Sequence, residues 1–238
     1  MDHHVALTLL FGGLALCCNF FYFWEAARCA ARDRCAPMTV WATAVFLAHD
    51  GSYLVNAHRW FSTYDHWFPI LFWVALIVTT GFDLVFLAQT ARYGRSEIAP
   101  RLSQRAYELV LAGAVVAAIA IWTVVKRSLD DPMYLTSFTI TIALCLPSAT
   151  TLLLRRGGGR GQSVRQYVAF TGMASAWFAC NMLVFGPAFK GFPYVALFVL
   201  IVVWGVGQTS ALHRAQGPSS VSSEAAVPCS TPEPISVA

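Results

Sequence analysis

Charged residues are scarce in this sequence of 238 residues. Only 12% of the residues are Asp, Glu, Lys or Arg, whereas 57% are hydrophobic. Charged residues make up about 25% of an ordinary soluble domain, so this composition excludes a soluble globular fold. The net charge of +4 follows from a few basic loops and does not indicate a nucleic-acid partner.

Several catalytic and cofactor-binding motifs are absent. The sequence has no GxSxG, no HExxH and no CxxC among its seven cysteines, so no hydrolase motif, zinc site or disulfide framework is indicated. The last hydrophobic block has no lysine, which excludes a retinal Schiff base. Asp130 and Asp131 are the only adjacent acids, and no DDxxD-like run could hold magnesium against a prenyl diphosphate. We therefore expect neither a metal nor a cofactor.

Hydrophobic blocks fill most of the chain. A helix of about 20 apolar residues crosses a bilayer, and each block reaches that length. The first block follows no basic residue and is longer than a signal-peptide core, so we expect it to be retained. The seven expected helices lie at about 5–27, 37–57, 67–91, 105–125, 132–154, 164–187 and 192–213.

The blocks predict an all-α, polytopic membrane protein with one transmembrane domain at 1–214. Residues 215–238 are rich in Ser, Pro and Ala, which predicts a disordered cytosolic tail. The lipid bilayer is the expected environment, and the oligomeric state stays open.

Basic residues predict the orientation. Short basic loops stay in the cytoplasm, so we expect the N-terminus outside the cell and the C-terminus in the cytosol. The membrane we expect is a bacterial plasma membrane. Twelve of the sixteen basic residues follow the first, third, fifth and seventh blocks: Arg28, Arg32, Arg34, Arg92, Arg95, Arg101, Arg105, Arg155, Arg156, Arg160, Arg165 and Arg214.

Acidic residues inside the blocks are the first candidates for a site, because a carboxylate in hydrocarbon is expensive and usually functional. Asp50 and Asp83 lie deep, at roughly 20 Å and 13 Å from the cytosolic face at 1.5 Å per residue. Neither has a basic partner within reach on its own helix. Each is either a satisfied buried hydrogen-bonding group or a catalytic acid, and we predict a catalytic role for both. Glu25 precedes Arg28 by three residues, so it forms either a structural ion pair or part of the site. We expect Glu108 to form an interfacial ion pair.

Aromatic and amide side chains share helix faces or neighbouring positions with these acids. Any one of them is explained by packing or by the membrane interface, but their coincidence with polar groups predicts a substrate-binding surface. The ten candidates are Phe46, His49, Tyr53, Tyr22, Phe72, Trp73, Trp177, Asn181, Trp204 and Gln208.

A carboxyl group in a dry aromatic cavity has its charged form disfavoured, stays protonated and can act as a general acid. Aromatic faces are negative and stabilise nearby cations. A proton donor in a cation-tolerant apolar cavity suits the acid-initiated cyclisation of a polyene.

Three stretches resemble a known family: "CCNFFYFWEAARCAARDRCAPMTVW" at 17–41, "VFLAHDGSY" at 45–53 and "VALIVTTGFDLVFLAQTARYGR" at 74–95. The chain resembles the small seven-helix integral-membrane terpene cyclases of fungal meroterpenoid and indole-diterpene pathways. It is also similar to their bacterial relatives in drimentine-type indole sesquiterpenoid biosynthesis. Length and helix count match along about 210 residues.

The resemblance implies a redox-neutral, metal-independent enzyme that cyclises a prenyl chain, a farnesyl chain above all, on an aromatic or indole-type acceptor. It implies that Asp50 is the proton donor, with His49 in a position that is aromatic in the family. The family has a second acid in its last helix, where this sequence has Gln208 instead. Asp83 or Glu25 replaces that acid, or one acid suffices. The alternative function is a small seven-helix transporter or permease.

Overall fold

The computed structural model describes residues 4–63, 67–129, 131 and 135–216. Every regular element in this part of the chain is a helix, which confirms the all-α prediction. The predicted tail beyond residue 216 lies outside the described residues, and the last helix runs one residue past the predicted domain end at 214.

The elements follow one another along the chain with short connections. They are α1 (Val5–Leu7), η2 (Thr8–Gly12), α2 (Gly13–Asp33), α3 (Val40–Leu54), η3 (Arg59–Thr63), α4 (Trp67–Ile98), α5 (Gln104–Leu129), α6 (Leu135–Arg156), α7 (Val164–Val184), η4 (Pro187–Lys190) and α8 (Phe192–Ala215).

Six spans in the described part of the chain are long and apolar enough to cross a membrane. They are the continuous α1–η2–α2 unit, α4, α5, α6, α7 and α8, which match six of the seven predicted blocks. The remaining block forms α3, which has 15 residues instead of the predicted 37–57. At 1.5 Å per residue α3 is about 22 Å long, shorter than a hydrocarbon core of about 30 Å. Its start is set by Thr39, whose side chain accepts the Ala42 N–H as an N-cap.

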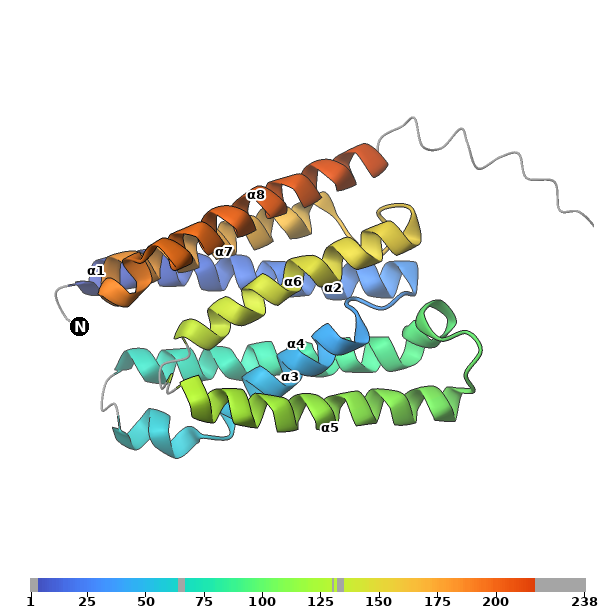
Figure 1. The fold of residues 1–238 in the computed structure, drawn as a ribbon, viewed down its shortest axis with the longest axis horizontal. Helices are drawn as coiled ribbons and strands as arrows, with labels where there is room; N and C mark the ends of the chain where they lie inside the picture. The colour runs from blue at the N-terminus through green and yellow to red at the C-terminus, as the bar shows by residue number, and fades with distance from the viewer. Residues whose placement is uncertain (1–3, 64–66, 130, 132–134, 217–238) are drawn as a thin grey trace, which may run out of the picture.

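The helices form two groups that meet along α2 and α4 (Figure 1). In the first group α7 packs between α2 and α8. In the second group α3 packs against both α4 and α5. Helix α6 crosses between the groups and contacts α3, α7 and α8. The largest buried core lies mainly among α2, α6 and α7, with smaller contributions from α3, α4 and α8.

The basic loops gather at one end of the bundle (Figure 1). Arg156, at the end of α6, donates to both Glu97 carboxylate oxygens at 2.6 and 3.0 Å and to the Ala36 carbonyl at 2.6 Å. Arg160 donates to the carbonyl of Asp33, the last residue of α2. The ends of α2, α4 and α6 thus meet, so the chain that includes α3 returns from this end to the opposite end before α4 begins.

Helix α8 approaches α7 closely at Gly205. A Cβ at this position would lie 2.5 Å from Thr171 Oγ1, whereas a Cβ at Gly207 would meet nothing within 4 Å. Small residues at helix contacts let backbones approach inside membranes. Of the two glycines of α8, only Gly205 is therefore required by packing.

Candidate functional site

A hydroxyl contact sets the register between α3 and α4, which run antiparallel (Figure 1). Thr43 Oγ1 lies 3.5 Å from Thr90 Oγ1. Asp50 follows Thr43 by seven residues, and Asp83 precedes Thr90 by seven. Seven residues are nearly two helical turns, so both acids return to the same interface at the same level. The sequence predicted different depths for them because it counted from cytosolic ends at Pro37 and Arg92. In the structure α3 begins at Val40 and α4 continues past Arg92 to Ile98.

The two carboxyl groups interact inside the bundle. Asp83 is 1% exposed and interacts electrostatically with Asp50, which is 3% exposed. Neither carboxyl oxygen of Asp83 has a hydrogen-bond partner in the described part of the chain. An ionised carboxylate buried without a partner is very costly, and two buried carboxylates repel each other. A proton placed on either carboxyl group would remove this repulsion.

His49 holds Asp50 in place. Its Nδ1 lies 2.6 Å from Asp50 Oδ1, and its side chain is fully buried. The imidazole packs edge-on against Trp122, with ring centroids 4.8 Å apart, and against Tyr53 at 5.5 Å. These contacts turn His49 toward α5, so it orients Asp50 and does not line the neighbouring cavity.

An aromatic wall lies one turn from Asp50. Phe46, the predicted partner of Asp50 on α3, packs edge-on against Phe23 of α2. Phe23 also contacts Phe82 and Phe86 of α4, with centroids 5.8 and 5.4 Å apart. The wall therefore lies between the carboxyl pair and the basic end of the bundle.

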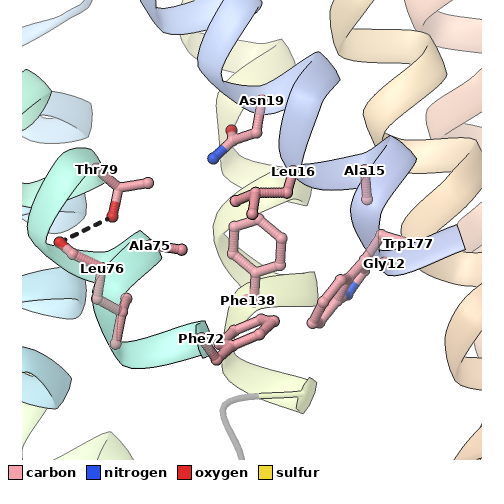
Figure 2. A pocket seen from close by; sticks show the side chains of 10 residues that line it. All are labelled: Gly12, Ala15, Leu16, Asn19, Phe72, Ala75, Leu76, Thr79, Phe138 and Trp177. Carbon is pink, nitrogen blue, oxygen red and sulfur yellow. Dashed lines mark hydrogen bonds between the residues drawn. The ribbon is translucent and has the colours of Figure 1, made fainter. Parts of the chain in front are cut away.

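An apolar slot opens between α2, α4, α6 and α7 (Figure 2). About 380 Å³ is free of protein atoms, including the part that opens outward. Most of this space lies in gaps between side chains that are too tight for water, so the slot is narrow. Its lining residues are Gly12, Ala15, Leu16, Asn19, Phe72, Ala75, Leu76, Thr79, Phe138 and Trp177.

Helix α4 connects the slot to the carboxyl pair. Phe72, Leu76, Thr79 and Asp83 follow one another at spacings of four, three and four residues, which places them on one helix face. Thr79 lines the slot, and Asp83 lies one turn beyond it. A chain that fills the slot would thus end close to the carboxyl pair.

Two of the ten predicted binding residues line the slot. Phe72 and Trp177 have ring centroids 5.9 Å apart, and Trp177 packs edge-on against Phe138 at 4.6 Å. Three aromatic rings from α4, α6 and α7 therefore meet at the slot (Figure 2).

A polar network behind the slot fixes Trp177. The Trp177 indole N–H donates to Thr139 Oγ1 at 3.2 Å, and Thr139 Oγ1 lies 3.4 Å from the Tyr194 hydroxyl. Asn181 Nδ2 donates to the same Tyr194 hydroxyl at 2.7 Å. Asn181 thus supports the slot from outside its lining.

Tyr53 and Trp73 fasten the end of α3. The Tyr53 hydroxyl lies 3.0 Å from Ser137 Oγ, and Lys126 Nζ lies 4.1 Å from the centre of the Tyr53 ring. Trp73 Nε1 donates to the Leu54 carbonyl at 2.9 Å. Both predicted binding residues therefore contact protein groups outside the slot.

Glu25 forms the ion pair that the sequence left open as an alternative. Its two oxygens accept from Arg28 Nε and Nη2, each at 2.8 Å, and one also accepts from Ser163 Oγ at 2.9 Å. The Tyr22 hydroxyl, on the same side of α2, lies 2.9 Å from Cys145 Sγ. These contacts turn Glu25 and Tyr22 toward α6 and α7 and away from the carboxyl pair.

Trp204 and Gln208 belong to a network at the α6–α8 contact. Trp204 Nε1 donates to Thr150 Oγ1 at 2.9 Å, and Thr150 Oγ1 donates to Gln208 Oε1 at 3.0 Å. Gln208 Nε2 donates in turn to Gln162 Oε1 at 3.3 Å. Gln208 therefore stands away from the slot lining, and the second acid near Asp50 is Asp83.

Sequence reasoning missed Asn19 and Phe138. Asn19 is the one amide in the first span, Val5–Asp33, and an isolated amide in an apolar helix could have identified it as a candidate. Phe138 gave no signal among 17 phenylalanines, because only packing distinguishes it from the others.

The fold and site define a class: a helical, multi-pass membrane protein with a buried carboxyl pair next to an aromatic slot. No family model matches the chain, and no match is found among curated proteins or solved structures.

Proposed function

We propose that the chain is a membrane-bound terpene cyclase. It uses a proton held by the Asp50–Asp83 pair to start cyclisation of a prenyl, specifically farnesyl, chain attached to an aromatic or indole-type acceptor. The observation that supports this most is the register of α3 and α4, which brings two buried acids together one turn from an aromatic slot. The resemblance of residues 17–41, 45–53 and 74–95 to membrane cyclases points to the same chemistry.

The proposed reaction conserves all atoms. The carboxyl pair gives one proton to an alkene carbon of the chain, and the neighbouring carbon becomes a cation. Ring closure moves the cation along the chain past the faces of Phe72, Phe138 and Trp177, which stabilise positive charge. A carboxylate takes the final proton back, so the product is an isomer of the substrate. A chain enters only when slot side chains such as Leu16 and Phe72 move apart, because the slot is narrow as it stands.

Asp83 is the member of the pair that faces the slot along α4, and no residue that the structure describes is hydrogen-bonded to its oxygens. Asp50 is held by His49 at 2.6 Å. In this proposal Asp50 remains part of the general acid, and Asp83 shares its proton instead of holding the acceptor.

Incubation of membranes containing the protein with a farnesylated indole tests the function. We expect a product of the same mass as the substrate and with fewer double bonds. In heavy water the product should gain one deuterium, because the donated proton comes from an exchangeable carboxyl group. Control membranes without the protein should give no such product. Unchanged substrate over a range of acceptors would contradict the proposal.

We also propose that the chain crosses the membrane seven times, with α3 as the second crossing, the N-terminus outside and the C-terminus in the cytosol of a bacterial cell. The support is the cluster of basic loops at one end of the bundle and the return of the chain through α3 (Figure 1). Basic loops stay cytosolic.

Cysteine labelling of intact cells checks this orientation, after Cys17 and Cys229 are replaced by Ala. A membrane-impermeant maleimide should label a cysteine introduced at position 2 and leave one at position 220 unlabelled until the cells are opened. The reverse pattern would invert the orientation, and equal labelling would show an even number of crossings.

The transporter alternative predicts broken helices at matching places in two halves of the chain. Helices α4 and α8 are each continuous, from Trp67 to Ile98 and from Phe192 to Ala215. These two helices therefore give this alternative no specific support.

A further inference from the structure

Asn19 is a polar side chain buried at the slot. It is 5% exposed, and its amide projects from α2 into the slot toward Thr79 of α4 (Figure 2). Within the described part of the chain its amide makes no hydrogen bond. An amide offers two hydrogen-bond donors and an acceptor. Leaving them without hydrogen bonds in an apolar site is costly. The slot therefore has an unused hydrogen-bonding group aimed at its ligand.

The other polar side chains at the slot are already engaged as donors. Thr79 Oγ1 donates to the Leu76 carbonyl at 3.2 Å, which leaves its lone pairs as acceptors (Figure 2). The Trp177 N–H donates to Thr139. A ligand group between Asn19 and Thr79 thus meets donors from the Asn19 amide and acceptors from both side chains.

A hydroxyl group matches this arrangement. It accepts one hydrogen bond from Asn19 Nδ2 and donates one to Asn19 Oδ1 or to Thr79 Oγ1. An ether or epoxide oxygen only accepts hydrogen bonds. It therefore pairs with the Asn19 N–H donor and leaves the oxygens of Asn19 and Thr79 without a hydrogen bond. A hydrocarbon satisfies neither.

We propose that Asn19 is a specificity-determining residue that selects an isoprenoid chain bearing a hydroxyl group at the end of the slot nearest Asp83. The inference rests on the slot being the substrate site of the proposed cyclase. It adds that the end of the chain remote from the acceptor bears a hydroxyl group, which the C1 hydroxyl of farnesol represents in the binding test. Asn19 holds the hydroxyl group, while Leu16, Phe72 and Phe138 contact the hydrocarbon part. The hydroxyl group then fixes how far the chain advances toward the carboxyl pair.

Binding of three probes of similar length tests this inference without any turnover. The probes are farnesol, farnesyl methyl ether and farnesene, competed against radiolabelled farnesol on purified protein, with empty micelles subtracted. We expect wild-type protein to bind farnesol about 3- to 10-fold more tightly than the ether, because one hydrogen bond is lost. We expect farnesene to bind about 10- to 100-fold more weakly than farnesol, because the amide is left unpaired.

Asn19→Leu replaces the amide by an apolar side chain of similar size. In this variant the three probes should bind within about twofold of one another, with farnesene bound more tightly than by wild-type protein. Gln89→Met is the matched control, because Gln89 donates to the Ala27 carbonyl at the same α2–α4 contact and does not line the slot. It should keep the wild-type preference. If Asn19→Leu does not fold, Thr79→Val supplies the test, since it removes an acceptor and should narrow the gap between farnesol and the ether.

Equal binding of all three probes by wild-type protein would overturn the inference, as would an unchanged preference in Asn19→Leu or no binding of farnesol. A preference for farnesol that disappears in Asn19→Leu, without cyclisation of any substrate, would uphold the binding role of Asn19 and refute the cyclase. Cyclisation of the farnesylated indole without a preference for farnesol would uphold the cyclase and refute the role of Asn19. The two proposals therefore fail separately.

Discussion

Asp83→Asn is expected to lower the rate of cyclisation by at least about 10²-fold, the usual contribution of a general acid. Asn keeps the size of the side chain but cannot deliver a carboxyl proton. Turnover of the farnesylated indole by variant and wild-type membranes, at equal protein content, measures the effect. Because the Asp83 oxygens are buried without a hydrogen-bond partner among the described residues, the variant should unfold at the same temperature or a higher one.

Asp50→Asn should cause a similar loss, because the pair is the acid. If the two carboxyl groups act as one unit, the double variant should be no slower than the slower single variant. Residues that act together give such non-additive effects. Two independent acids would instead give losses that multiply.

Thr80→Val is the control for both substitutions. Thr80 neighbours the slot residue Thr79 on α4, and its buried hydroxyl has no partner within residues 4–63, 67–129, 131 and 135–216. The change therefore removes a polar group near the site without touching the acids. It should leave turnover within about twofold of wild type. Near-normal turnover in both Asp83→Asn and Asp50→Asn would place the proton donor elsewhere.

The second large effect is expected on stability, from Arg156→Met. The Arg156 side chain is 5% exposed and joins α6 to Glu97 of α4 and to the carbonyl of Ala36. Removing one partner of a buried ion pair leaves the other charge uncompensated, which costs 3–5 kcal/mol in measured cases. We expect the free energy of unfolding to fall by about 3 kcal/mol. Unfolding in mixed micelles at increasing SDS fraction measures it.

Arg214→Met is the matched control. Arg214 is exposed at the end of α8 and donates only to the Ser210 carbonyl within the described part of the chain, at 3.4 Å. Its loss should change the free energy of unfolding by less than about 0.5 kcal/mol. A double variant of Arg156→Met with Glu97→Gln should recover part of the loss, because no unpaired carboxylate remains. Equal stability of wild type and Arg156→Met would show that the basic end is held by other contacts.

Sequence reasoning identified the acids correctly as buried groups but not their relation. An acidic residue in a hydrophobic block can be recognised from the sequence alone. Each membrane-spanning helix must be compatible with the hydrocarbon along its own length, so a polar residue within it stands out. Whether Asp50 and Asp83 meet depends on how far α3 and α4 slide past each other. That register is set by side-chain contacts such as Thr43 with Thr90, which no local pattern encodes.

The aromatic and amide candidates show the same limit. Tyr22, Tyr53, Trp73 and Trp204 were expected at the site because they share faces or neighbouring positions with polar groups, yet each engages protein groups elsewhere. A helix in a bundle has several inward faces, and spacing along one helix does not say which neighbour each face meets. Asn19 faces the slot because of how α2 packs against its neighbours, which the spacing along α2 does not show.

The sequence by itself determined the helical class, six of the spans and the basic character of alternate loops. These follow from hydrophobicity, helix length and charge, which act segment by segment. Tertiary structure decided that α3 is short, that Glu25 pairs with Arg28 and Ser163, that Asp50 and Asp83 lie level, and that Phe72 and Trp177 share a slot with Asn19. These features depend on contacts between distant segments, whose energies are decided only when the helices pack together.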